Sequence, residues 1–281
     1  MDEVQFDFHD PKQKEMFLYL LKMKKINANK ALMHAIEHGD LDIVKALVET
    51  GDCDLNYSLY SEPPYDCKHC CQKLDYNASL HETPLFIAIM YRDTDMLMYL
   101  VSLDDCDVNK KNKDGNTPLM FAICRENLTL VEILLSTGKC DVNVKNQEGC
   151  TALMFAVCIN RPDMVKLLLD TGNCDFNVQD QKGHTCLMYM FNYQDIDYKL
   201  LKSDYDEPIS SEDIDSESIS SFNSEHERRN ESEDEKQLEI FKLILGAGKC
   251  DLDLKNQDGN SFLDFTHWNK KIDELVTKKS F

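Results

Sequence analysis

The sequence predicts an all-α protein, a solenoid of about six helix-turn-helix units joined by short hairpin loops. Two observations predict this fold class. Leu85, Leu119, Leu153 and Leu187 are spaced by 34 residues, so the chain is built from an internal repeat. Each interval also contains two apolar runs of helical length separated by polar residues, which indicates one helix pair per repeat. Because a single helix pair cannot bury its apolar face, such units must stack to be stable.

Each unit starts its first helix in the same way. In the clearest unit, Gly115 supplies a turn, Thr117 is placed to cap the helix N-terminus and Pro118 suits the first helical position. A second apolar run at 128–135 ends before Gly138, which can cap a helix in the left-handed conformation. The polar stretch between that glycine and the next unit is long enough only for a tight hairpin. The unit is therefore predicted to be two helices followed by a hairpin loop.

This pattern resembles the ankyrin repeat, whose signature is close to G-x-T-P-L-H-x-A-A followed by I-V-K-L-L-L-x-x-G-A-D-V-N. Residues 149–156 and 164–177 match it most fully, and the resemblance covers roughly 27–276 apart from two insertions. It implies an N-terminal capping helix, five repeats and a C-terminal capping repeat. The expected ranges are 1–26 for the capping helix, 27–57, 79–112, 113–146, 147–180 and 181–256 for the repeats, and 257–281 for the last unit.

Two departures from the signature affect the loops. A cysteine takes the place of the family's alanine in the loop after each second helix, as in Cys140 and Cys174. We expect these cysteines to be buried, reduced and unreactive. Methionine replaces the signature histidine, whose imidazole ties neighbouring loops together, so we expect weaker hydrogen bonding between repeats. These methionines are Met33, Met120, Met154 and Met188.

The first insertion, residues 58–78, is rich in cysteine. Cys67, His69, Cys70 and Cys71 place four soft ligands within five residues, and together with a further ligand folded back they would bind Zn²⁺. A structural zinc site usually needs a second, separated pair of ligands, and none is evident in the insertion. We therefore expect reduced surface thiols here, with a zinc-binding loop as the alternative.

The second insertion, residues 195–236, splits the fifth repeat between its two helices. From 203 to 235 it carries 13 acids, nine serines and two arginines, and such a segment cannot bury enough apolar area to offset its ordering entropy. We expect a disordered loop that the fold tolerates because its ends lie close together. Ser210, Ser224 and Ser232 each have an acid three residues on, a pattern that acidophilic kinases prefer, so phosphorylation is a second interpretation.

Composition and charge indicate which kinds of partner and which compartment to expect. The net charge of −20 repels phosphate backbones and anionic lipid over most of the surface, so neither nucleic acid nor a membrane is an expected partner. No apolar stretch of membrane-spanning length and no secretory signal is visible. We expect a monomer in the cytosol or nucleus, or in the host cytoplasm if the protein is a viral or bacterial effector.

Motifs for catalysis are few. His34-Ala35-Ile36-Glu37-His38 matches the H-x-x-E-H pattern of inverted zinc proteases, which makes a metallohydrolase a remote alternative. The repeat register explains these positions without a metal, and no phosphate-binding or nucleophile-elbow motif is present. We therefore expect no enzyme, no catalytic residue and no cofactor.

The resemblance implies that the protein is an interaction scaffold that binds a partner protein in a concave groove made by hairpin tips and first-helix faces. An adaptor or effector whose working element is the acidic loop or the cysteine-rich loop is the alternative. The repeat register places the following residues in the groove: Met90, Tyr91, Lys113, Asp114, Asn116, Arg125, Gln147, Glu148, Ile159, Gln181, Lys182, His184 and Tyr193.

Overall fold

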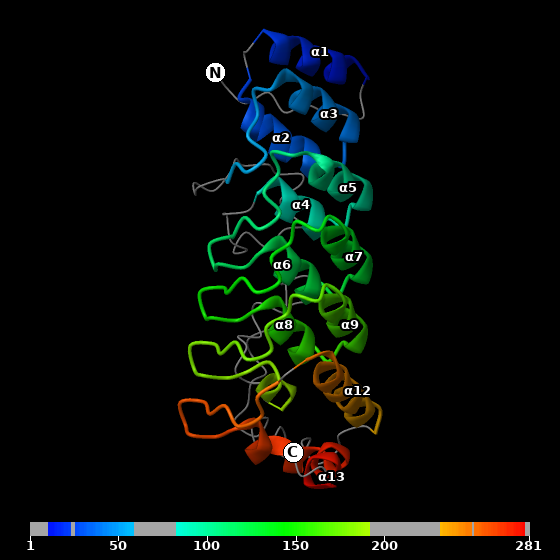
Figure 1. Cartoon of the computed structure of the whole chain (residues 1–281). Coiled ribbons are helices and arrows are strands. Elements are labelled where there is room, and N and C mark those ends of the chain that lie inside the picture. The colour runs from blue at the N-terminus through cyan, green and yellow to red at the C-terminus, as the bar shows by residue number, and fades with distance from the viewer. Residues whose placement is uncertain (1–10, 24–25, 59–82, 192–230, 249, 279–281) are drawn as a thin grey trace, which may run out of the picture. The chain divides into compact units, whose positions relative to one another are not determined.

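The computed structural model describes residues 11–23, 26–58, 83–191, 231–248 and 250–278, and among these it contains helices and loops but no strand (Figure 1). The chain forms two compact units. Of the described residues, those up to Cys140 form the N-terminal unit and those from Asp141 onwards form the C-terminal unit. In the part of the chain that is described, no helix is long and apolar enough to cross a membrane.

The N-terminal unit is a single helix followed along the chain by a stack of helix pairs. Within each pair the first helix lies next to the loops, in what we call the inner row, and the second helix lies on the side away from the loops, in the outer row (Figure 1). α2, α4 and α6 pack in sequence along the inner row, and α5 packs on α7 in the outer row. The helices are α1 (Pro11–Lys22), α2 (Ala28–Glu37), α3 (Leu41–Thr50), α4 (Pro84–Met90), α5 (Thr94–Ser102), α6 (Pro118–Cys124) and α7 (Leu128–Ser136).

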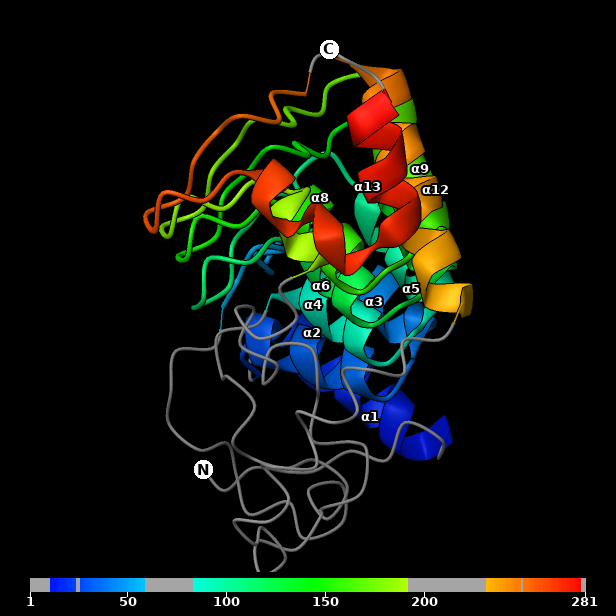
Figure 2. The same ribbon diagram turned by 90° about the horizontal axis from the view of Figure 1, so that it is seen from below.

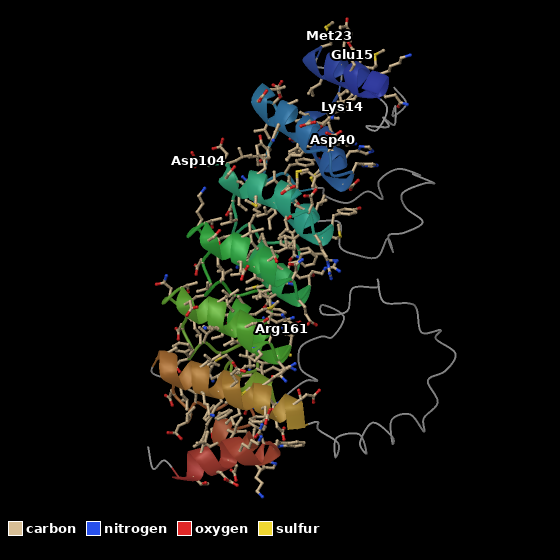
Figure 3. All side chains as sticks on the ribbon, turned by 90° about the vertical axis from the view of Figure 1, so that its right-hand side faces the viewer. Lys14, Glu15, Met23, Asp40, Asp104 and Arg161 are labelled. Carbon is tan, nitrogen blue, oxygen red and sulfur yellow. The ribbon has the colours of Figure 1, made fainter. Side chains whose placement is uncertain are left out.

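The capping helix α1 is held by apolar and ionic contacts. Phe17 and Leu21 are buried, as expected for a helix that covers the first repeat. On the same helix, Nζ of Lys14 lies 2.9 Å from Oδ1 of Asp40, the residue that caps α3 (Figure 3). The hydrogen bond to Asp40 raises the pKa of Lys14. Because Asp40 also accepts from the backbone N–H of Ile43, the carboxylate joins the start of α3 to α1.

The C-terminal unit continues the same plan with shorter first helices. α8 packs on α9 and on the 3₁₀ helix η2, whereas α12 packs on α9 and α13. The expected first helix of the fifth repeat is only the three-residue η2, whose hydrogen bonds link residues three apart. The elements are α8 (Ala152–Cys158), α9 (Pro162–Asp170), η2 (Met188–Met190), α12 (Glu231–Ala247), η3 (Phe262–Trp268) and α13 (Lys270–Lys278).

Helix α12 starts earlier than the sequence indicated. It begins at Glu231, so residues 231–236 are helical although we assigned them to the insertion at 195–236. Acidic side chains in the first turns of a helix interact favourably with its dipole, which offsets their poor hydrophobicity. Hydrogen bonds with residues distant in sequence also hold the helix in place. Gln237 is 2% exposed, donates to the carbonyl of Met190 at 2.9 Å and accepts from the amide of Asn269 at 3.1 Å.

The core follows the repeat, with two exceptions. Leu119, Ala122, Leu134, Leu153, Ala156 and Leu168 are buried within their units, as the apolar pattern predicts. Ile133 and Leu167, which we also expected in the core, are only half-buried. In each second helix the buried residues stand at positions i, i+1 and i+4, as in Leu130, Val131 and Leu134. Ile133 and Leu167 lie on the flank of that stripe.

Asparagine side chains join neighbouring loops within each unit. In the N-terminal unit, Nδ2 of Asn56 donates to the carbonyl of Asp105 at 2.8 Å, and its Oδ1 accepts from the N–H of Asp107 at 2.8 Å. In the C-terminal unit, Asn143 makes the equivalent pair of bonds with the carbonyl of Asn173 and the N–H of Asp175. Asparagines therefore join neighbouring loops within each unit.

Candidate functional site

The turns between the two helices of a pair place one variable side chain each at the end of an inner helix. Tyr91, Arg125 and Ile159 are the C-cap residues of α4, α6 and α8, and His38 is the C-cap of α2. In each case the cap is made by the backbone N–H, which donates to carbonyls of the preceding turn. These backbone hydrogen bonds are the same whichever side chain the cap residue carries.

In the N-terminal unit, two of these side chains are well defined. Tyr91 is 41% exposed. Arg125 is half-buried, and its guanidinium lies over the ring of Phe121 at 4.9 Å from the centroid. The Phe121 ring in turn packs 5.4 Å from that of Phe86. A cation–π contact of this kind holds an arginine side chain in place.

The remaining candidates on the inner helices are less exposed or lie outside the described residues. Met90, just before Tyr91, is half-buried, and so is Ile159 in the C-terminal unit. Tyr193 lies outside the described residues, as do the cysteine-rich candidates Cys67, His69, Cys70 and Cys71 and the serines Ser210 and Ser224. Ser232, the third serine of the phosphorylation pattern, is exposed in the first turn of α12.

The loop candidates fall into an exposed and a buried group. Lys113, Gln147, Glu148, Gln181 and Lys182 are exposed, and Asp114 is half-buried. Figure 2 shows that, within each unit, the loops project from the helices towards one side. In the C-terminal unit the backbone N–H of Gln181 donates to the carbonyl of Glu148 at 2.8 Å, and the Gln181 side chain donates to the carbonyl of Gln147. These glutamines thus contribute to cohesion between loops.

Asn116 and His184 were assigned to the groove surface, and this was wrong. Asn116 is 5% exposed and His184 is 4% exposed. Both directly follow a glycine with positive φ, and both backbone N–H groups bond to a side-chain oxygen four residues earlier, on Asn112 and Asp180. This closed turn carries the residue after the glycine inwards, a geometry that spacing alone does not reveal.

Around His184 the C-terminal unit contains a buried polar cluster that the sequence analysis missed. The hydroxyl of Tyr189 donates to Oδ2 of Asp180, and Sγ of Cys150 lies 3.2 Å from the same hydroxyl. Nδ1 of His184 lies 3.5 Å from Oδ2 of Asp180. Although burial alone would raise the pKa of Asp180, the hydrogen bonds from His184 and Tyr189 hold it below its usual value. An ionised carboxylate is therefore stabilised inside the loop.

A second feature that sequence reasoning missed is the backbone of the inter-helix turns. Arg92, Glu126 and Asn160 have φ of 56°, 51° and 53°, in the left-handed region that disfavours L side chains. The first repeat has Gly39 at the equivalent position, with φ of 68°. The sequence contained a sign of this backbone geometry. Tyr91 follows His38 by 53 residues and Arg92 follows Gly39 by the same interval, so Arg92 occupies a position that is glycine in the first repeat.

The H-x-x-E-H motif is arranged for packing. The rings of His34 and His38 stack with centroids 4.2 Å apart, and Nδ1 of His38 lies 2.9 Å from the carbonyl of His34. Burial, followed by the proximity of His38, lowers the pKa of His34 to about 4. Among the residues that the structure describes, no three His, Cys, Asp or Glu side chains gather closely enough to bind a metal ion.

The cysteines that recur in the loops are thiols of low reactivity. Burial raises the pKa of Cys106, Cys140, Cys174 and Cys250 to about 11. Only Cys106 is fully buried. The other three are half-buried, so our expectation of burial was too strong. Sγ of Cys140 lies 3.3 Å from the carbonyl of Leu134, so the thiol closes the end of α7.

Comparison with known proteins identifies the repeat. The sequence profile of the family described as ankyrin repeats (3 copies) matches residues 61–146 and 125–209, more than half of the chain. The chain belongs to the ankyrin repeat family. A profile for a single ankyrin repeat matches residues 27–56 as well. No curated protein matches the chain.

A solved ankyrin repeat protein has the same fold. The chain is similar to the crystal structure of EF0377, an ankyrin repeat protein, with a TM-score of 0.57 and 20% sequence identity. The similarity covers 89% of this chain and 98% of the other. In this ankyrin repeat protein the methionines that replace the signature histidine have a capping role. Sδ of Met120 accepts from the N–H of Thr117 at 3.5 Å, and Met154 does the same for Thr151 at 3.4 Å.

Proposed function

We propose that this ankyrin repeat protein is a non-enzymatic scaffold that binds a partner protein through its inner-helix turns and adjoining loops. One observation carries the proposal. Positions that the fold requires repeat along the chain, whereas the C-cap positions change from histidine to tyrosine, arginine and isoleucine while keeping the same backbone hydrogen bonds. Ankyrin solenoids use surfaces of this kind to bind other proteins.

The residue types at these positions support binding. Tyrosine and arginine are enriched among the residues that dominate binding energy at protein interfaces. Tyr91 is 41% exposed, and Arg125 lies over the ring of Phe121, so less side-chain entropy is lost when a partner contacts the arginine. On the loops, exposed Lys113 is a further candidate in the N-terminal unit, and Gln147, Glu148, Gln181 and Lys182 are the candidates of the C-terminal unit. Tyr193 stays a candidate outside the described residues.

The compartment and the oligomeric state are part of the same proposal. The cysteines of the described residues are all free thiols, which is the usual state in a reducing compartment. We therefore place the protein in the cytosol or nucleus, as a monomer that binds neither membrane nor nucleic acid. The net charge of −20 supports the last point, because it repels polyanions.

Affinity capture with the full chain tests the proposed surface. A partner recovered by capture is titrated against the parent chain and against a Tyr91→Ala, Arg125→Ala double variant. We expect binding weaker by more than about 2 kcal/mol with little change in stability, because both side chains are peripheral to the core. Met98→Ala is the matched control, since Met98 is 56% exposed on the outer helix α5 of the same unit. Equal affinity of the double variant and the control for every captured partner would contradict the proposal.

A further inference from the structure

The capping helix α1 exposes an apolar stripe on the side that faces away from the first repeat. Met16, Tyr19 and Met23 are 54%, 59% and 53% exposed, and their spacing of three and four residues places them on one face of a helix. Met23 follows the last residue of α1 and continues its hydrogen bonding, because its N–H donates to the carbonyl of Tyr19 at 3.1 Å. Figure 3 shows Met23 on the far side of α1 from Asp40. We call these three side chains the cap face.

An apolar surface at the end of a repeat stack calls for a cover. Terminal repeats have polar outer faces, because an apolar end would promote association. Six large apolar side chains are exposed among the described residues, and three of them form the cap face. The contact with the first repeat does not account for them, since the buried side chains of α1, Phe17 and Leu21, lie on another face of the helix. We therefore expect another segment to lie on the cap face.

The ten residues before α1 have the composition that such a cover requires. Val4, Phe6 and Phe8 alternate with polar residues, so in an extended segment they share one side. The same ten residues carry four acids and no lysine or arginine, whereas residues 12–25 carry five lysines and one glutamate. The excess of positive charge remains even without Lys14, which is paired with acids of the first repeat. The two neighbouring segments are therefore complementary in both charge and apolar pattern.

We propose that residues 2–8 form a strap that runs back along α1 and packs Val4, Phe6 and Phe8 on the cap face. The lengths of the two surfaces agree. Along the helix the cap face spans about 10 Å, and an extended chain from residue 4 to residue 8 spans about 13 Å. The strap therefore passes all of the cap face once the chain reverses direction just before the start of α1 at Pro11. The opposite net charges of the two segments favour this arrangement over a detached strap.

The strap suits the cap face better than a second copy of the chain does. Two copies joined at α1 would bring two lysine-rich segments together, and each whole chain carries a net charge of −20. The strap has the opposite sign to α1 and is tethered directly to the helix that it covers, so its effective concentration is about millimolar or higher. Once covered, the cap face gives the stack the polar end that a monomer requires.

Oxidation of methionine by dilute hydrogen peroxide tests the strap in the full chain. Met98 on α5 is 56% exposed, almost the same as Met16 and Met23, so the three should oxidise at similar rates unless a segment covers the cap face. Met33 in α2 is 2% exposed, so it stays unreactive only while the N-terminal unit is folded. Peptide mass spectrometry gives the rate for each methionine.

Two variants remove the strap from the cap face. The first is Phe6→Asp with Phe8→Asp, and the second is a deletion of residues 2–8. Gln5→Asp with His9→Asp is the matched control for the first variant. It adds the same charge on the other side of an extended segment and keeps all three apolar side chains of the strap.

We expect Met16 and Met23 to oxidise about threefold or more slowly than Met98 in the parent chain and in the control. In the double variant and in the deletion, all three should oxidise at the same rate while Met33 stays unreactive. Equal rates for the three in the parent chain would overturn the inference, and so would protection that survives both variants. Protection that weakens when the parent chain is diluted would assign the cap face to a second copy and overturn the inference as well.

Discussion

Replacing Tyr189 by phenylalanine probes the buried polar cluster of the C-terminal unit without changing its packing. The ring of Tyr189 is 2% exposed, and its hydroxyl donates to Asp180. One and two repeats earlier the equivalent residues are Phe155 and Phe121, so the phenylalanine ring fits this repeat. Tyr189→Phe therefore deletes the hydrogen bond to a buried carboxylate together with the weaker contact to Cys150, and it creates almost no cavity. A hydrogen bond to a charged group contributes about 1.5–3 kcal/mol, and we expect a loss of stability in this range.

A double-mutant cycle isolates that hydrogen bond. Asp180→Asn keeps an oxygen that can accept from the N–H groups of Lys182 and His184, as Asn146 does for its own loop, but removes the charge. Urea unfolding followed by circular dichroism gives the four stabilities. The coupling energy between the two substitutions should be about 1–3 kcal/mol. A coupling energy near zero, or a Tyr189→Phe variant as stable as the parent chain, would refute this account of the cluster.

The buried polar cluster around Asp180 predicts that the stability of the protein depends on pH. The folded pKa of Asp180 is held below its usual value, so the unfolded chain binds the proton more tightly. The stabilisation is thus complete above the unfolded pKa of about 3.9 and is lost as the pH falls through the folded pKa. The difference between the parent chain and Tyr189→Phe should be constant from pH 6 to 8 and shrink below about pH 4. A difference that persists unchanged into acid would show that the carboxylate is not its origin.

Three further predictions concern single positions. Gly149→Ala should destabilise the protein far more than Gly172→Ala in thermal unfolding. Both glycines have positive φ, but a Cβ on Gly149 would lie 2.9 Å from the backbone of Asp180, and nothing lies within 4 Å of one on Gly172. NMR titration should give His34 a pKa of about 4, so its stabilising effect is lost as the pH falls from about 6.5 towards 4, and a value near 6.5 would contradict its burial. At pH 8, Cys140 should react with a bulky thiol reagent at least tenfold more slowly than in the unfolded chain, because its pKa is about 11.

Much of the fold could be predicted from local sequence because each repeat carries its own start signal. Thr117 caps α6 and Pro118 begins it, as their positions indicated. The start of α12 could not be predicted in the same way. Composition at 231–236 favours disorder, but the helix is fixed by contacts of Gln237 with Met190 and Asn269, which are distant in sequence. The local sequence pattern contains no information about contacts with residues that are distant in sequence.

The candidate surface was predictable only where the repeat register settles the backbone geometry. Register assigned Tyr91 and Arg125 to equivalent first-helix positions, and the structure has them at the C-caps of α4 and α6. Asn116 and His184 were misplaced because a turn with positive φ rotates the chain, and register alone does not give the direction of a side chain. The strain at Arg92 became visible only when the turn was compared with Gly39.

The turns and the loops of this protein differ in what they require of side chains, and this difference indicates where recognition can vary. Loop side chains such as Asn109 and Asn143 donate to the carbonyl of the next loop, so replacing them weakens the stack. The turns close through backbone hydrogen bonds, so an exposed side chain such as Arg92 can change with little effect on the fold. Partner choice encoded at the turns can therefore alter without loss of stability. Partner choice encoded by the loop asparagines would reduce the cohesion between repeats each time it changed.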